Sequence, residues 1–419
     1  MKKMIAIIIC LAWGVFGCAK GIPQDPNADV QGHTPATPIT ARANQQVLEE
    51  LPFSDEQDFA DSRRGLIASD PGLSVKNAKG KIIWNQPAYG FIGGKAPASV
   101  NPSLWRQAKL NNIHGLFKVT EGIYQLRGFC LANLTLIDGK SGWIVVDPLM
   151  TKQTASRAID FARKHLKERP ISAVILTHSH IDHFGGVAAL LDEKILQNPN
   201  IPVIAPKGFI EEATSENVIA GIAMSRRAGY MYGKRLSPSV RGHVDNGLGK
   251  STPFGTFDLI TPNHLVDRTP QEMTIDGVRF VFQYAPESEA PAELAFYLPD
   301  KKAFCGAELA SHTMHNLYTL RGAKVRNALK WSGYIDQAIR LFGDAQVYFS
   351  CHLWPIWGNA RVMDFLKRQR DLYKYIHDQT IRLANVGYTP REIAERIELP
   401  DSLNRSFSER GYYGTLSHN

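Results

Sequence analysis

Ten residues near the middle of the chain, THSHIDHFGG at 177–186, place three histidines and an aspartate within six positions and end on two glycines. The chain has only 13 histidines in 419 residues, so this concentration needs an explanation. The apolar run ISAVIL just before it predicts a buried strand that ends where the histidines begin. Because α/β proteins gather functional groups at the carboxyl ends of strands, we expect a site here.

The spacing of His178, His180, Asp182 and His183 suits metal coordination. On a strand-to-helix turn, residues two apart can point into one cavity, so His178 and His180 suit one metal while Asp182 and His183 can reach a second. Imidazole and carboxylate ligands together favour Zn²⁺ and other first-row metals, and the two glycines allow a tight turn beside them. The competing interpretation, a surface cluster or a hydrogen-bonded core, would be favoured for one histidine but not for this pattern.

Strand and helix patterns continue on both sides of this motif. Upstream, GIYQLRG, LANLTLIDGKSG and WIVVDPL predict short strands, and TASRAIDFARKHLKE predicts a helix with one apolar face. Downstream, FDLITP, EMTIDGVRFVFQYAP, LAFYLPD and KKAFCG predict further strands, and residues 362–419 are mainly helical in pattern. The alternation indicates an α/β fold, with residues 51–112 as an arm packed against the main domain.

The first residues, MKKMIAIIICLAWGVFGCAKG, have the pattern of a secretory signal peptide: a charged start, a short apolar run and small residues. VFGC, which ends at Cys18, resembles the lipobox of bacterial lipoproteins. Residues 1–18 therefore predict a periplasmic protein, either anchored to the outer membrane through lipid on Cys18 or released by cleavage nearby. Residues 19–50, rich in Pro, Thr, Ala, Asn and Gln, predict a disordered tether.

Charge and cysteine content exclude some classes of protein. The formal net charge is +8, but the basic residues form no long runs, so we expect no nucleic-acid partner. Cys130, Cys305 and Cys351 are isolated along the chain and predict small buried residues rather than a disulfide framework.

The THSHIDH motif resembles that of the metallo-β-lactamase superfamily, whose fold is an αββα sandwich with a metal site at one edge of the sheets. Most members supply a further His, a bridging Asp and a final His. This chain departs from that pattern: YAPESEAPAEL offers Glu287, Glu289 and Glu293 and no histidine, FCGAELASHTMHN offers Glu308, and FSCHLWPIWGN offers His352.

Glutamate at these positions narrows the resemblance to the zinc-dependent alkyl sulfatases of that superfamily. SENVIAGIAMSRRAGYMYG, TIDGVRF, SEAPAELAFYLPD, AELASHTMHNLYTLRGAKVR, HLWPIWGN and RGYYGTLSHN carry it, over about residues 100–419. The resemblance implies two Zn²⁺ ions per chain, one held by His178, His180 and Glu289, the other by Asp182, His183 and His352, with Glu308 between them. Glu287 or Glu293 could replace Glu289, and Cys351 is a rival to His352.

Two zinc ions that share a water can convert it to hydroxide near neutral pH. The metal pair alone is therefore compatible with hydrolysis of an ester, amide, lactone, phosphate or sulfate. We expect Asp182 to lie in the reacting centre. The resemblance places Asn316 and Arg321 in a sulfate-binding segment, and the planar fork of arginine matches paired sulfate oxygens. An internal salt bridge is the alternative for Arg321. The resemblance thus implies hydrolysis of an alkyl sulfate monoester to an alcohol and inorganic sulfate.

Four further side chains each have two alternative roles in this interpretation. A helix that starts near Ala307 would align Glu308 with His312 and His315, which could donate protons or simply pack. Tyr230 and Tyr232 could line the pocket or fill the core.

The domain boundaries follow from the same resemblance. Residues 113–361 predict the catalytic domain, and 362–419 the start of a helical dimerisation domain. The family continues into more helices and a sterol-carrier-like domain, whereas this chain stops at LSHN; the resemblance implies a homodimer. Two rival hypotheses remain: another hydrolase of the superfamily (phosphodiesterase, lactonase or β-lactamase), and a non-catalytic, membrane-tethered zinc protein.

Overall fold

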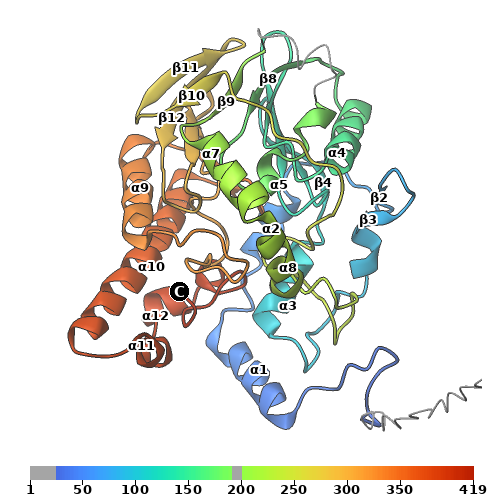
Figure 1. Ribbon diagram of the computed structural model, residues 1–419, viewed down its shortest axis with the longest axis vertical. Helices are drawn as coiled ribbons and strands as arrows, with labels where there is room; N and C mark the ends of the chain where they lie inside the picture. Colours follow the sequence, from blue (N-terminus) through green and yellow to red (C-terminus); the bar gives the residue numbers. More distant parts are fainter. Residues whose placement is uncertain (1–24, 191–200) are drawn as a thin grey trace, which may run out of the picture.

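The computed structural model describes residues 25–190 and 201–419 (Figure 1). The predicted signal peptide at 1–18, with Cys18, and the start of the predicted tether lie outside the described residues. Among those that are described, no helix combines the length and apolar character needed to cross a membrane.

The first sheet has eight strands, in the order β1-β4-β5-β6-β7-β8-β9-β10. Pairing is antiparallel up to β7 and parallel from there to β10, because the chain crosses over through a helix between β7 and β8. The strands that the upstream patterns predicted are β5, β6 and β7, and that prediction is confirmed. The bounds are β1 (Leu66–Ala68), β4 (Gly115–Thr120), β5 (Ile123–Arg127), β6 (Leu134–Asp138), β7 (Trp143–Val146), β8 (Ile171–Ile175), β9 (Val203–Pro206) and β10 (His264–Val266).

The second sheet has six strands, in sequence order from β11 to β16. Its one parallel pair, β14 with β15, spans the crossover that contains helix α9. The bounds are β11 (Gln271–Ile275), β12 (Val278–Tyr284), β13 (Leu294–Leu298), β14 (Ala303–Cys305), β15 (Val347–Phe349) and β16 (Ile356–Trp357). A separate hairpin pairs β2 (Ser74–Lys76) with β3 (Ile82–Asn85).

The two sheets pack face to face through an apolar core. This core joins Ile144 and Ile175 of the first sheet to Phe282, Phe296 and Phe349 of the second. On the outer faces, α4 (Lys152–His165) covers the first sheet, and α9 (Ala328–Leu341) with α10 (Asn359–Asn385) covers the second. Figure 1 shows α4 on one side of the strands and α9 and α10 on the other. The αββα sandwich predicted from the sequence is confirmed.

Helix α4 illustrates how the sequence specifies an element of this fold. Thr151 caps its start, since the Thr151 Oγ1 accepts a hydrogen bond of 3.2 Å from the backbone of Thr154. Ala155, Ala158 and Ala162 then recur at helical spacing and are fully buried against the sheet. Basic residues in the last turn complement the helix dipole.

The remaining helices surround the sandwich. Those after residue 358 confirm the predicted helical C-terminal region, in which α10 is the longest helix. The α-helices are α1 (Pro38–Glu50), α2 (Gln57–Arg63), α3 (Pro102–Leu110), α5 (Ile181–Phe184), α7 (Phe209–Thr214), α8 (Gly221–Met231), α11 (Pro390–Arg396) and α12 (Asp401–Asn404). Shorter turns are η1 (Gln86–Tyr89), η2 (Val187–Ala189), the π-helical η3 (Ser215–Ile219), η4 (Pro299–Lys301) and η5 (Phe407–Glu409).

The predicted disordered tether at 19–50 is wrong for residues 38–50. Helix α1 occupies these residues, and the Oγ1 of Thr37 caps it. Val47 and Leu51 are buried against Phe407 near the other end of the chain. Polar composition suggested disorder, but a few apolar residues at helical spacing are enough when another part of the protein covers them.

The predicted strand FDLITP is also wrong. Residues 257–262 have no regular secondary structure, and β10 begins at His264 instead. The backbone N–H of Asp258 donates to the carbonyl of Gly185 at 2.9 Å, so this segment lies along the histidine motif rather than in the sheet.

Cys130, Cys305 and Cys351 are all free and buried, as the sequence predicted.

Candidate functional site: two groups of metal ligands beside a cavity

The histidine motif lies where strand β8 ends and helix α5 begins. The rings of His178 and His183 approach to 3.9 Å between centroids, and those of His178 and His180 to 5.0 Å. All three side chains are buried. The turn between strand and helix therefore gathers the imidazoles into one interior space, as the spacing predicted.

The two glycines after the motif are required by close packing of the backbone. A Cβ on Gly185 would lie 2.2 Å from the carbonyl oxygen of Met150, and one on Gly186 would lie 2.1 Å from that of Pro148. No side chain fits at such distances, so any substitution would displace the loop after β7 from the motif.

The first group of potential ligands combines His178, His180, Glu289 and Glu308. One ligand atom from each lies within 4.8 Å of all the others. The Oε2 of Glu289 is 2.9 Å from the Nδ1 of His180, and the Oε2 of Glu308 is 3.2 Å from the Nε2 of His178. The second sheet thus brings two carboxylates to the imidazoles at the end of β8.

The second group combines Asp182, His183 and His352, again within 4.8 Å of one another. The Oδ2 of Asp182 is 3.3 Å from the Nε2 of His183 and 3.6 Å from the Nε2 of His352. The Oε2 of Glu308 is 3.5 Å from His183 and 3.3 Å from His352. Glu308 therefore faces both groups, which is the position that a bridging ligand needs.

These residues fit a pair of divalent cations. Five of their buried atoms make no hydrogen bond to any described residue: the Nε2 atoms of His178, His180, His183 and His352, and the Oε2 of Glu289. Buried polar atoms in proteins nearly always have a partner. Unpaired imidazole nitrogens that converge with carboxylates form the donor set of a metal such as Zn²⁺.

The structure separates the three glutamates that the sequence left as alternatives. Glu287 is exposed and pairs with Lys330 at 2.7 Å. Glu293 is buried, but it accepts hydrogen bonds from the hydroxyl of Ser288 and from two backbone N–H groups. Only Glu289 of the three lies in a group of potential ligands within the described residues.

Cys351 lies on the other side of His183 from the two groups. It is near Asp147, which accepts from the Nδ1 of His183, whereas the second group is on the Nε2 side. Burial raises the pKa of the Cys351 thiol well above its ordinary value. The Nε2 of His352 converges with the carboxylate of Asp182 and the Nε2 of His183, so the geometry favours His352 as the ligand of the second group.

Asp147 was missed by the sequence analysis. It follows strand β7, and its carboxylate accepts hydrogen bonds from the Nδ1 of His183 at 2.8 Å and from the Thr177 backbone at 2.9 Å. Burial raises the pKa of Asp147, but the charge and the hydrogen bond of His183, together with the charge of His178 and a hydrogen bond from Cys351, outweigh burial and hold the pKa below its ordinary value. A carboxylate that fixes the far nitrogen of a ligand histidine orients the ring. The only sequence signal was an aspartate at the end of a predicted strand.

Arg326 was missed as well. Its guanidinium, only 2% exposed, donates to the side chain and the backbone carbonyl of Glu289. It also donates to the side chain and carbonyl of Asn316. Arg326 therefore supplies the counter-charge that keeps Glu289 ionised away from water. No spacing rule would have selected it.

Asn316 is not among the residues that line the cavity described below, and its role as a substrate contact stays a prediction. Its Oδ1 is taken by Arg326, and its Nδ2 donates to the carbonyl of Tyr413 at 3.0 Å. These bonds hold the end of the chain against the segment before α9.

The predicted helix from Ala307 does not form. Ala307 has φ +48°, a left-handed conformation that no α-helix accommodates, and the segment from there to α9 is irregular. His315 nevertheless reaches Glu308, with 3.0 Å between Nε2 and Oε1. His315 thus holds a potential ligand, from a loop rather than from a helix face.

His312 points away from the two groups of potential ligands, and a role for it in catalysis stays a prediction. Its ring stacks on Trp354 with 4.4 Å between centroids, and its Nε2 lies 3.0 Å from the Trp354 carbonyl oxygen. It does not contact the two groups of potential ligands or the cavity beside them.

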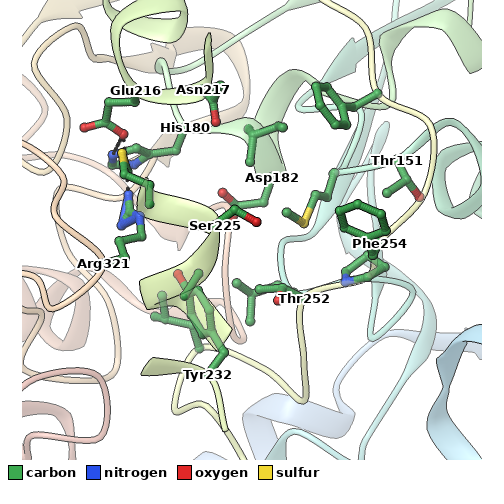
Figure 2. A pocket seen from close by; sticks show the side chains of 18 of the residues that line it. Thr151, His180, Asp182, Glu216, Asn217, Ser225, Tyr232, Thr252, Phe254 and Arg321 are labelled. Carbon is green, nitrogen blue, oxygen red and sulfur yellow. Dashed lines mark ion pairs between the residues drawn. The ribbon is translucent and has the colours of Figure 1, made fainter. Parts of the chain in front are cut away.

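A cavity of about 280 Å³ opens beside the two groups, and His180, Asp182, Glu289 and Glu308 line its inner end. Figure 2 shows His180 with Glu216 and Arg321 on one side, and Thr151 and Phe254 on the other. The remaining lining is mainly apolar: Leu131, Met150, Ile181, Met224, Ala228, Leu248, Pro253, Phe254 and Phe257. A polar inner end and an apolar wall suit an amphiphilic ligand.

Of the other predicted substrate contacts, Arg321 and Tyr232 line this cavity, whereas Tyr230 does not. Tyr230 is 72% exposed, because its position on α8 points it to solvent. The hydroxyl of Tyr232 is 2.6 Å from that of Tyr413. The Nη2 of Arg321 is 3.7 Å from the Oε2 of Glu216, another residue that the sequence analysis missed.

Comparison with known proteins agrees with this geometry. A family model described as the metallo-beta-lactamase superfamily matches residues 127–282, which include strand β8 and the histidine motif. This part of the chain carries a domain of the metallo-β-lactamase superfamily.

Within that superfamily, the chain is similar over most of its length to named alkylsulfatases. It is 50% identical over 388 residues to a linear primary-alkylsulfatase of a Pseudomonas species, covering 92% of this chain and 58% of that protein. It is 48% identical over 384 residues to the alkyl/aryl-sulfatase BDS1 of Saccharomyces cerevisiae, covering 91% and 59%.

A solved structure is similar to the same extent. The inverting sec-alkylsulfatase Pisa1 of a Pseudomonas species matches with a TM-score of 0.90 and 43% identity, over 92% of this chain and 61% of that one. The chain thus spans less than two thirds of the length of each of these relatives.

Proposed function

We propose that this chain hydrolyses alkyl sulfate monoesters to an alcohol and inorganic sulfate, with two zinc ions held by the two groups of ligands. The observation that carries the proposal is one cavity that joins three features: the ligand groups, a partly buried arginine and an apolar wall. The names of the relatives support the same substrate class.

The ligand groups would hold the metal pair, with Glu308 facing both ions. When bound, two such ions lower the pKa of a shared water and polarise an ester oxygen. The chain's own residues keep the ligands in place: Asp147 orients His183, and His315 holds Glu308. Such fixed orientation is what a hydrolytic metal centre requires of the protein around it.

Arg321 would bind the sulfate group. Its side chain is only 12% exposed and lines the cavity beside the ligand groups. Its planar guanidinium can donate two parallel hydrogen bonds to a pair of sulfate oxygens. The apolar wall around Met224 and Phe254 would take the alkyl chain and exclude water from it.

The test uses the purified chain with metal analysis and an assay of sulfate release. Octyl and dodecyl sulfate are compared with a phosphodiester and a β-lactam. We expect about two zinc ions per chain and sulfate release from the alkyl sulfates. The His180→Ala variant should lose metal and nearly all activity. Turnover of another substrate with no sulfate release would refute the proposal, and an active, zinc-loaded His180→Ala variant would remove His180 from the centre.

A periplasmic lipoprotein anchored through Cys18, and a homodimer, remain predictions of this proposal. Labelling with radioactive palmitate in a bacterial host checks the anchor, because the label should be lost in a Cys18→Ala variant. Sedimentation of the purified chain checks the dimer.

A further inference from the structure

Glu216 is a buried carboxylate that the metal centre does not use. It lies in the π-helical segment η3, its side chain is 5% exposed, and it lines the cavity. Three other carboxylates line the same cavity, namely Asp182, Glu289 and Glu308, and all three belong to the groups of potential metal ligands. A pair of divalent cations would offset the charge of those three, whereas the cationic side chains that line the cavity with Glu216 are Arg321 and Lys234.

The neighbours of Glu216 place its charge next to the anion site. Its Oε2 is 3.7 Å from the Nη2 of Arg321 and 3.6 Å from the Nε2 of His180, the two ion pairs dashed in Figure 2. Its Oε1 accepts from the backbone N–H of Lys324 at 3.3 Å, which fixes the carboxylate. At 3.7 Å the contact with Arg321 is longer than a hydrogen bond, so the guanidinium keeps its donors for a ligand.

A fixed negative charge beside the anion site affects ligands according to their charge. A sulfate monoester carries one negative charge, whereas a phosphate monoester carries nearly two above its second pKa of about 6. Each charge on the ligand is repelled by Glu216, so a dianion loses about twice as much binding energy to it as a monoanion. The repulsion is strong here because the cavity is buried.

We propose that Glu216 determines specificity: it makes the Arg321 site select a monoanionic tetrahedral headgroup, such as an alkyl sulfate, over a dianionic one, such as an alkyl phosphate. The inference rests on the proposed function and adds to it a residue that rejects phosphate monoesters. Selection of this kind works by penalising the wrong ligand rather than by new contacts with the right one.

The test compares two ligands of equal chain length that the enzyme does not need to turn over. Octanesulfonate carries one negative charge, and octyl phosphate carries nearly two at about pH 8. Their dissociation constants are measured by calorimetry on the zinc-loaded protein. The measurement is made on the unaltered chain and on the variants Glu216→Gln, Glu216→Asp and Glu212→Gln.

Glu212→Gln is the matched control, because it makes the same change of charge close by in the sequence. Glu212 lies on α7, pairs with the exposed Lys324 and does not line the cavity. Glu216→Asp keeps the negative charge in a shorter side chain. Both variants should therefore leave the ratio of the two dissociation constants close to that of the unaltered chain.

Glu216→Gln should strengthen the binding of octyl phosphate relative to that of octanesulfonate by roughly tenfold or more, because it removes one nearby negative charge. Zinc content should stay unchanged. The proposal is overturned if the ratio does not move, if Glu216→Asp moves it equally, or if Glu216→Gln loses zinc. Failure of both ligands to bind the unaltered chain also overturns it. Since binding is measured without turnover, an enzyme that binds octanesulfonate but releases no sulfate would refute the proposed function alone.

Discussion

Two arginines from one loop, the buried Arg326 and the partly buried Arg321, contact the candidate site in different ways. The guanidinium N–H groups of Arg326 donate hydrogen bonds to Glu289 and Asn316, so protein atoms occupy its donors. Arg321 lines the cavity and stays 3.7 Å from its acidic neighbour, Glu216. The comparison teaches that an arginine enclosed by protein acceptors serves as a counter-charge, whereas one that faces a cavity keeps its donors for a ligand.

Replacing Arg326 should have the largest effect on folding. Arg326→Met leaves the carboxylate of Glu289 buried without its partner, and the loss of one member of a buried pair costs about 3–5 kcal/mol. We expect that decrease in the free energy of unfolding, measured with denaturant, together with a loss of bound zinc. Arg321→Met is the control and should cost clearly less. Equal losses of unfolding free energy in the two variants would show that the two arginines do not differ in their contribution to folding.

Asp147→Asn tests a second side chain that, like Arg326, is enclosed by protein and holds a potential ligand in place. The amide keeps the shape of the side chain but loses the charge that orients His183. Removing such a partner typically weakens metal binding by roughly 10–100-fold, which competition with a chelator measures directly. Zinc affinity within a factor of two of the unaltered chain would mean that the ring is held by its packing.

Arg321→Lys tests the arginine that faces the cavity. The ammonium keeps the charge but lacks the bidentate fork, so we expect KM for octyl sulfate to rise about tenfold, with zinc content and melting temperature unchanged. Steady-state kinetics and metal analysis on the same preparation separate the two effects. Unchanged KM would remove Arg321 from the anion site and would weaken the comparison.

Tyr232→Phe should have the smallest effect. It removes the hydroxyl that lies 2.6 Å from that of Tyr413 and leaves one buried hydroxyl without this partner, which costs about 1 kcal/mol of stability. Thermal unfolding measures the cost, and zinc content should not change. A loss of stability as large as that for Arg326→Met would show that this residue of the cavity wall contributes as much to folding as the enclosed Arg326.

Much of the fold could be predicted because its signals are local. The helix α4, the strands from β5 to β8 and the helical C-terminal region follow from apolar periodicity and turn residues. Two predictions failed where longer-range contacts decide the conformation. Helix α1 forms because residues near the C-terminus cover it, and residues 257–262 follow the histidine motif instead of joining the sheet.

The residues of the candidate site likewise include some that local spacing predicted and others that it did not. His178 to His183 lie within one turn, so their spacing alone indicated a shared centre. Glu289, Glu308 and His352 were placed through resemblance to a family, since no spacing relates residues so far apart. Asn316 was placed through the resemblance and His312 through an expected helix; in the structure His312 packs on Trp354 and Asn316 bonds to Arg326, so their predicted roles in the reaction rest on neither contact.

The sequence by itself determined the motif at 177–186, the strand that leads into it and the α/β character of the chain. These depend on contacts among neighbouring residues, which spacing and side-chain type specify. Only the tertiary structure decided that the second sheet brings Glu289 and Glu308 to those histidines, that Arg326 is enclosed while Arg321 faces a cavity, and that Glu216 lies beside it. The physical reason is that the stacking of two sheets joins residues whose separation along the chain leaves no periodic trace.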